Sequence, residues 1–286
     1  MDKPPWLKIK YNPASSRVKE LLGNYRLNTV CQSAHCPNCQ ECWAAGTATF
    51  MVLGNECTRN CRFCAVKTNP KPKPPNLTEP KRLANAVSEL GLKYVVLTSV
   101  DRDDLLDFGA GHFAKCIQAI KKKDPKIIVE ALVPDFNKDE KAIRMVMESG
   151  VDVLGHNIET VERLTPRVRD ARAGYRKSLD VLRLFKTLNP RHETIKTKSS
   201  IMLGLGETKD EVEKAMKDLR EAGVDILTIG QYLQPSKKQL GVERYVHPDE
   251  FKEYERIGKS MGFMSVVSGP FVRSSYHAAE SFSTVI

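Results

Sequence analysis

The chain has 286 residues, of which 41% are apolar, so it can bury a sizeable core as one large domain or two small ones. No apolar run approaches membrane-spanning length and the first residues form no secretory or transit signal, so we expect a cytoplasmic protein in a reducing environment. The net charge of +10 suits nucleic acid, a membrane surface or an acidic protein, but the basic residues are spread along the chain, so charge alone selects no partner.

The predicted elements alternate between strands and helices. The first 30 residues read as an arm outside the core, because they contain several prolines and one short amphipathic stretch, 16–25. The expected strands are 47–53, 94–98, 127–132, 151–156, 196–203 and 224–229. The first expected helix ends near Gly91, and the last begins after Pro248. The four helices between them are expected at 108–122, 138–149, 175–188 and 208–222. Six β-then-α units predict an α/β fold with a parallel sheet and helical crossovers.

The order of these elements fits both an open doubly wound sheet and a barrel. No G-x-G-x-x-G follows a strand, which weakens the dinucleotide-binding interpretation. In either architecture the functional loops follow the carboxyl ends of the strands. Four polar clusters occur there, namely the cysteine loop after the first strand and residues 98–101, 157–160 and 204–207. We therefore expect these loops to outline one site.

Seven of the eight cysteines fall within residues 31–64, and we expect the eighth, Cys116, to be an ordinary buried thiol. Clustered cysteines in a reducing compartment indicate metal or redox chemistry rather than disulfides. Cys57, Cys61 and Cys64, the triad, are spaced C-x3-C-x2-C. Three thiolates suit an iron–sulfur cluster with one iron open to a small molecule, whereas a structural zinc site prefers four ligands.

A second set, the upstream group, consists of Cys31, Cys36, Cys39 and Cys42, spaced C-x4-C-x2-C-x2-C. Four cysteines can fill a zinc site or a fully ligated ferredoxin-like cluster from this segment alone. The segment is too polar and interrupted for a regular element. Spacing does not select three of these cysteines over all four.

The triad matches the signature of the radical S-adenosylmethionine superfamily, which the chain resembles because the motif lies in the loop after the first strand. The resemblance implies that the amino and carboxylate groups of S-adenosylmethionine bind the open iron. It also implies that cleavage of the sulfonium yields methionine and a 5′-deoxyadenosyl radical. Phe63, inside the motif, resembles the aromatic residue that packs on the adenine.

The same resemblance gives the polar loops expected roles around the cofactor. Residues 98–101 occupy the position of the amino-group-binding loop, and Asn157 that of a ribose-binding residue. Residues 200–207 are loosely similar to the superfamily's G-x-I-x-G-x-x-E stretch, and Lys198 on the same strand can reach the cofactor carboxylate. Without the resemblance, Asp101 and Glu159 are ordinary surface carboxylates. The expected cofactor-binding residues are Phe63, Thr98, Ser99, Asp101, Asn157, Glu159, Lys198 and Met202.

A narrower resemblance covers residues 6–278. The spacing Cys31-x4-Cys36-x5-Cys42, followed by the triad, closely resembles the lipoyl synthase family. The segment 269–276, which ends in Arg-Ser-Ser-Tyr, also fits that family. Two cysteine triads together with this stretch form a very specific combination.

The lipoyl synthase resemblance implies an auxiliary [4Fe–4S] cluster on Cys31, Cys36 and Cys42, with a serine as its fourth ligand. That serine corresponds to Ser275 here. Cys39 departs from the family pattern, so it either displaces Ser275 or is a bystander thiol, and we favour the bystander. The expected metal ligands are Cys31, Cys36, Cys42, Cys57, Cys61, Cys64 and Ser275, and the triad and Ser275 are the expected catalytic residues.

The resemblance further implies a partial (β/α)6 TIM-like barrel at residues 47–262. An N-terminal extension at 1–46 carries auxiliary cluster ligands, and a C-terminal extension at 263–286 carries the Arg-Ser-Ser-Tyr stretch. The implied reaction inserts two sulfur atoms at C6 and C8 of an octanoyl chain on a protein lysine. The auxiliary cluster is the implied sulfur donor, and the implied cofactors are two [4Fe–4S] clusters and S-adenosyl-L-methionine.

The implied partners are octanoylated lipoyl-carrier domains, namely acyltransferase subunits of 2-oxoacid dehydrogenases and the glycine cleavage H protein. An electron donor such as ferredoxin or flavodoxin is also implied, whereas nucleic acid and membrane are not expected partners. Two alternatives are another radical sulfur-inserting enzyme, such as a biotin synthase or a methylthiotransferase, and a zinc-stabilised basic RNA-binding protein. The first lacks the paired triads with Arg-Ser-Ser-Tyr, and the second predicts colourless protein and salt-dependent RNA binding.

Overall fold

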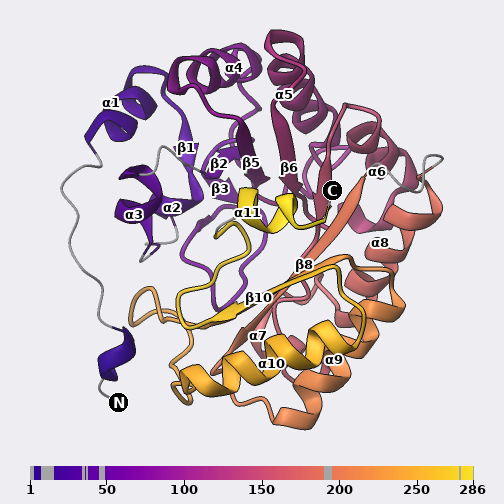
Figure 1. Cartoon of the computed structure of the whole chain (residues 1–286). Helices are drawn as coiled ribbons and strands as arrows, with labels where there is room; N and C mark the ends of the chain where they lie inside the picture. The colour runs from indigo at the N-terminus through magenta and orange to yellow at the C-terminus, as the bar shows by residue number, and fades with distance from the viewer. Residues whose placement is uncertain are drawn as a thin grey trace. The chain divides into compact units, whose positions relative to one another are not determined.

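The computed structural model describes residues 3–7, 16–33, 36, 38–44, 49–189, 195–276 and 278–285 (Figure 1). The chain divides into two compact units. The N-terminal unit contains residues 10–60 and 65–154, and the C-terminal unit contains residues 1–9, 61–64 and 155–286. The boundary crosses the cysteine motif, so that Cys57 belongs to the first unit and Cys61 and Cys64 to the second.

The N-terminal unit contains strands in the order β1-β2-β5-β6-β7. The strand β1 pairs antiparallel with β2, while β2 with β5 and β5 with β6 are parallel. The strands are β1 (Asn28–Thr29), β2 (Thr49–Val52), β5 (Tyr94–Ser99), β6 (Ile128–Leu132) and β7 (Val153–Gly155), and β3 (Glu56–Cys57) and β4 (Lys67–Thr68) form a separate ladder. The helices are α1 (Ser16–Asn24), α2 (Val30–Ser33), α3 (Cys39–Ala44), α4 (Glu79–Leu90), α5 (Ala110–Lys123), η3 (Phe136–Lys138) and α6 (Glu140–Met147).

Burial explains why these segments form a sheet with helices. All four residues of β2 are buried, as expected for a parallel strand with both faces covered. Helix α4 begins with a proline in its first turn and ends at Gly91, whose φ of 65° is the left-handed conformation that glycine adopts readily. It packs on α5 (Figure 1), and Leu83 and Phe113 from these two helices are fully buried.

The C-terminal unit continues the same pattern. Its strands β8 (Lys196–Leu203), β9 (Ile226–Gln231) and β10 (Ser265–Gly269) are parallel neighbours. Its helices are η1 (Pro5–Leu7), η4 (Glu162–Leu164), α7 (Thr165–Val168), α8 (Tyr175–Thr187), α9 (Lys209–Glu221), α10 (Pro248–Ser260) and α11 (Ala278–Ser283). The predicted capping box is confirmed, because the Thr208 side chain accepts from the Glu211 amide and the Glu211 side chain accepts from the Thr208 amide.

The predicted α/β class with parallel strands is confirmed. All six expected strands and the helices between them are present within a few residues, although Thr47 and Ala48 lie outside the described residues. The segment from Ser265 to Gly269 adds a further parallel strand that we did not expect. Among the described residues, no helix is long and apolar enough to span a membrane.

The expectation that residues 31–42 form no regular element is wrong. Two short helices, α2 and α3, occupy this segment. Cys31 and Trp43 are buried there, so the segment contributes apolar surface despite its polar composition. Burial of those side chains offsets the poor intrinsic helix propensity of the polar residues.

Candidate iron–sulfur centre

Cys57 lies on β3 in the N-terminal unit, where backbone amides surround its sulfur. The amides of Asp101 and Arg59 donate to Cys57 Sγ at 3.3 and 3.4 Å. The Asp101 carboxylate oxygen Oδ2 lies 3.7 Å from the same sulfur. N–H donors directed at sulfur favour the thiolate, which is the form that binds iron.

Cys61 and Cys64 are anchored within the C-terminal unit. The amide of Asp170 donates to Cys61 Sγ at 3.3 Å. The Gln239 side chain donates to the Cys64 carbonyl at 3.2 Å, which fixes the backbone at the end of the motif. Burial first, and then the charge of Cys64, raise the pKa of Tyr232 to about 12. This loop therefore presents two sulfurs from a backbone that other loops of the same unit hold.

The chemistry of these donors fits an iron–sulfur cluster. All three cysteines of the triad are partly exposed. Two of the three sulfurs already accept backbone N–H groups, which is the usual environment of thiolates that ligate such clusters.

The expected amino-group loop follows β5, and its residues differ in environment. Thr98 is buried, and Ser99 is half-buried with an Oγ atom that finds no hydrogen-bond partner among the described residues. The Asp101 carboxylate lies 3.2 Å from the Arg59 guanidinium. A buried hydroxyl without a protein partner fits a site that takes a polar ligand.

The other expected cofactor residues come together along β8. The Glu159 amide donates to the Ser200 carbonyl at 3.2 Å, and the Met202 amide donates to the Glu159 carbonyl at 2.8 Å. The Lys198 carbonyl accepts from the His156 amide at 3.0 Å, next to Asn157. The segment 156–159 therefore runs beside β8, and this brings Asn157, Glu159, Lys198 and Met202 into one strip.

Glu159 is an unusual member of this strip. Its φ of 67° is left-handed, which is uncommon for a residue with a side chain. Burial raises the pKa of Glu159, and the charge of Arg169 and a hydrogen bond from Asn157 only partly offset that effect. Arg169 is itself buried, and its Nε finds no partner in the described part of the chain. Strain and unmatched polar atoms of this kind accompany ligand sites.

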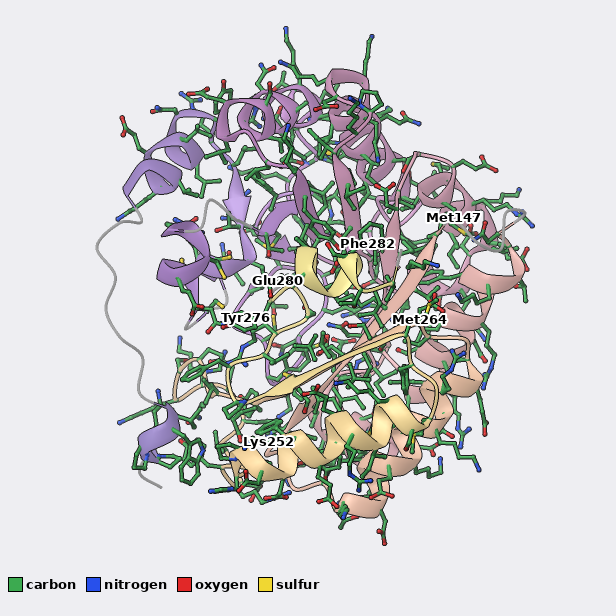
Figure 2. The ribbon with its side chains drawn as sticks, viewed as in Figure 1. Met147, Lys252, Met264, Tyr276, Glu280 and Phe282 are labelled. Atoms are coloured by element: carbon green, nitrogen blue, oxygen red, sulfur yellow. The ribbon has the colours of Figure 1, made fainter. Side chains whose placement is uncertain are left out.

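Phe63 and Ser275, the two other expected residues outside the upstream group, are both half-buried. Phe63 lies within the motif. Ser275 lies in the C-terminal segment between β10 and α11, where Figure 2 labels its neighbour Tyr276. That segment approaches β9 closely, because a Cβ added at Gly230 would lie only 2.0 Å from the Val272 carbonyl oxygen.

The upstream group is held by its own short turns. The Cys36 amide donates to the Cys31 carbonyl at 3.0 Å, and the Cys39 amide donates to the Cys36 carbonyl at 3.2 Å. Cys39 and Cys42 lie one turn apart on α3. Burial and the nearby thiols of Cys31 and Cys36 raise the pKa values of Cys39 and Cys42 to about 12. All four thiols therefore lie close enough to interact electrostatically, and Cys39 is not set apart.

The upstream group, as the structure describes it, does not have the geometry of a closed tetrahedral zinc site. In the described part of the chain, the one group with three ligand atoms within 4.8 Å of one another is Glu79, His112 and Cys116. The sulfurs of the upstream group are therefore spread more widely than the roughly 3.8 Å between sulfurs that zinc–thiolate bonds of about 2.3 Å impose. A four-iron cluster separates its thiolates further.

Sequence reasoning missed Arg59 and its partners. Arg59 lies inside the cysteine motif, is buried, and forms hydrogen bonds with Asp103 and Asp135. The sequence did carry a signal. A charged residue in a loop expected to be buried needs partners of opposite charge, and aspartates follow two of the predicted strands.

Comparison with known folds agrees with this architecture. The FeFe-hydrogenase maturase HydG from Carboxydothermus hydrogenoformans aligns with a TM-score of 0.60 over 95% of this chain and 68% of that one, at 13% identity. A second HydG structure aligns with a TM-score of 0.61 over 95% of this chain and 67% of that one, at 15% identity. These similarities show the fold, and the predicted partial TIM-like barrel is confirmed.

Sequence comparison identifies the family. The radical SAM superfamily profile matches residues 51–219. The lipoyl synthase of Methanocella arvoryzae is 54% identical over 287 residues, which cover 99% of this chain and 96% of that protein. The lipoyl synthase of Ectopseudomonas mendocina is 53% identical over 98% of this chain and 80% of that protein. The chain therefore belongs to the lipoyl synthase family of the radical SAM superfamily.

Proposed function

We propose that the chain uses two [4Fe–4S] clusters to insert sulfur at C6 and C8 of an octanoyl chain on a protein lysine. Membership of the radical SAM superfamily implies the first cluster and S-adenosylmethionine. The proposal adds that the triad binds this cluster and that Cys31, Cys36 and Cys42 bind an auxiliary one. The observation that carries it is the presence of two separate cysteine groups in a chain about 53% identical to lipoyl synthases.

The proposed division of labour follows from the chemistry of the substrate. Unactivated C–H bonds resist acid–base chemistry, and bound S-adenosylmethionine supplies the radical that removes hydrogen from them. One molecule of S-adenosylmethionine is cleaved for each of the two hydrogens removed. In the proposal the auxiliary cluster provides both sulfur atoms and is consumed.

The residues around the cofactor have proposed roles that match their environments. Asp101, beside the Cys57 sulfur, and Ser99, whose hydroxyl has no hydrogen-bond partner among the described residues, face the amino group. Asn157 and Glu159 hold the ribose and the neighbouring part of the cofactor, and Lys198 interacts with the carboxylate. The remaining proposed contacts are those of Phe63, Thr98 and Met202.

Ser275 is the proposed fourth ligand of the auxiliary cluster, because the Arg273-to-Tyr276 stretch is complete. An alkoxide is a weak ligand for iron in a sulfide cluster, so it detaches more readily than a thiolate, which suits a cluster that is dismantled. Cys39 is the second candidate. The observation that favours it is that, after burial, the thiols of Cys31 and Cys36 raise the pKa of Cys39, so Cys39 interacts with two of the proposed ligands.

The proposed substrate proteins are octanoylated lipoyl-carrier domains. Family membership implies a lipoyl carrier as substrate, and the proposal extends this to dehydrogenase acyltransferase subunits and the glycine cleavage H protein. Ferredoxin or flavodoxin is the proposed electron donor, and the cytoplasm the proposed location. Carriers of this kind are typically acidic, so the charge of +10 favours docking.

The deciding experiment is anaerobic reconstitution, followed by incubation with S-adenosylmethionine, a reductant and an octanoyl-lysine peptide. We expect about eight irons per chain, as two four-iron clusters require, together with dithiolane product and loss of one cluster. 5′-Deoxyadenosine without sulfur transfer to the peptide would contradict the proposal. Colourless protein with bound zinc would instead favour the RNA-binding alternative.

A further inference from the structure

Arg59 lies between Cys57 and Cys61 in sequence, yet it is only 5% exposed. Its guanidinium donates to both oxygens of Asp135 at 2.7 and 2.8 Å. It also donates to Asp103 from Nε at 3.0 Å and from Nη2 at 2.8 Å. Nη1 lies 3.2 Å from an oxygen of Asp101. One buried cation thus contacts three carboxylates, all in the N-terminal unit.

The three carboxylates come from two neighbouring strand ends. Asp101 and Asp103 follow β5, and Asp135 follows β6. Thr58 adds to the connection, because its hydroxyl donates to Asp103 at 2.6 Å and its amide donates to the Asp101 carbonyl at 3.0 Å. Arg59 therefore ties the cysteine loop to the carboxyl ends of two parallel strands, the end of the sheet where functional groups gather.

The exposure of the three carboxylates is graded. The Asp135 side chain is fully buried, whereas the side chains of Asp103 and Asp101 are 18% and 24% exposed. Asp135 thus acts as the internal anchor, and Asp101 is the member that solvent or a ligand can reach. Three carboxylates against one guanidinium leave an excess of negative charge, which favours a cationic ligand at the open end.

This network also touches the iron-binding sulfur. The amides of Arg59 and Asp101, the two ends of one ion pair, both donate to Cys57 Sγ. The position of the sulfur and the position of the Asp101 carboxylate are therefore set by the same contacts. A lysine cannot replace them, because only a planar guanidinium can bind two carboxylates in a bidentate manner at once.

We propose that Arg59 is a positioning residue that holds Cys57 and the Asp101 carboxylate in a fixed relation, so that the cofactor's amino group donates to Asp101 beside the cluster that Cys57 binds. This inference rests on the proposed role of Asp101 as a cofactor contact. Arg59 itself touches neither substrate nor cofactor, and it acts through Asp101 and Cys57.

The test compares full-length R59K and D135N with wild type, all reconstituted anaerobically. R59K keeps the charge and loses the bidentate contacts, and D135N weakens the anchor without touching a cysteine. R176K is the matched control, because Arg176 makes a bidentate pair with Glu162 on the surface. The first measurements are iron per chain and the EPR spectrum of the reduced cluster on Cys57, Cys61 and Cys64, with and without S-adenosylmethionine. The kinetic measurements are KM and kcat for cleavage of S-adenosylmethionine.

We expect R59K and D135N to keep their iron, to raise the KM for S-adenosylmethionine roughly tenfold, and to lose most of the spectral change on its addition. R176K should match wild type. An unchanged KM and spectral response in both variants, even with a lower melting temperature, would overturn the inference. If R59K does not hold iron, D135N alone decides between these outcomes. Absence of dithiolane product in wild type would contradict only the proposed function. The spectral response to S-adenosylmethionine and the kinetics of its cleavage do not depend on sulfur transfer, so they still test the role of Arg59.

Discussion

The two cysteine groups of this chain are built in different ways. The sulfurs of Cys57 and Cys61 accept amide hydrogens from residues 44 and 109 positions away, Asp101 and Asp170. The upstream group is held partly by local hydrogen bonds, such as that from the Cys36 amide to the Cys31 carbonyl, and partly by burial of Cys31 and its contact with the Thr49 backbone. Contacts distant in sequence thus position Cys57 within one unit and Cys61 within the other, whereas two short helices carry three of the four upstream cysteines.

This contrast is consistent with the proposal of two clusters, of which only the auxiliary one is consumed. A site that lasts through many reactions benefits from ligands held by distant loops, because losing the metal does not collapse them. A site that is emptied and refilled benefits from a local structure that rearranges without disturbing the core. Short helices with few long-range contacts are the part of a protein most able to do so.

The largest expected effect comes from removing each group separately. Alanine at Cys57, Cys61 and Cys64 should abolish cleavage of S-adenosylmethionine. Alanine at Cys31, Cys36 and Cys42 should preserve cleavage and abolish dithiolane formation. Each triple variant should bind about four irons instead of eight. Iron analysis with product quantification checks this, and cleavage lost equally in both variants would break the distinction between the groups.

The next effect concerns the fourth ligand of the auxiliary cluster. We expect Ser275→Ala to reduce dithiolane formation roughly a hundredfold and to change the iron ligand signal in X-ray absorption, since an oxygen ligand is lost. Cys39→Ala should leave both near wild type. The reverse pattern, with a lost sulfur ligand in Cys39→Ala, would assign the site to four cysteines. Cys116→Ala serves as the control thiol, because Cys116 lies in the buried core away from both groups in sequence.

A smaller effect should follow from filling the contact under the C-terminal segment. An alanine at Gly230 would place its Cβ 2.0 Å from the Val272 carbonyl oxygen, so that segment must shift. We expect Gly230→Ala to lower the free energy of unfolding by about 1–3 kcal/mol and to reduce sulfur insertion more than cofactor cleavage. Gly241→Ala is the control, because nothing lies within 4 Å of its added Cβ. Equal loss of both activities would show that the segment serves the whole fold.

The smallest effect concerns docking of the carrier. If the net charge of +10 attracts acidic carriers, raising the salt concentration from about 50 to 500 mM should raise the KM for an octanoylated carrier domain about threefold. An uncharged octanoyl-lysine peptide should show no such change. Steady-state turnover of the carrier that is insensitive to ionic strength would remove electrostatic docking from the proposal.

The sequence by itself determined the α/β class and the position of the triad. Strand and helix patterns, the Thr208–Glu211 capping box and the Gly91 stop are local signals, because each depends on residues within one or two turns. The spacing of the triad is equally local. Local signals of this kind can be recognised in the sequence without knowing which residues the segment contacts in the folded chain.

Only the tertiary structure decided which distant side chains meet. Arg59 pairs with Asp103 and Asp135, which are 44 and 76 positions away, and no local pattern specifies that pairing. The strand β10 was missed because its sequence, Ser-Val-Val-Ser-Gly, is short and only Val266 is buried, so pairing with β9 rather than an apolar pattern makes it a strand. Cys39 departs from the family pattern, and the folding of α3 places it one turn from Cys42. Long-range pairing is decided by what the folded chain can bury and neutralise together, and the order of residues does not state this directly.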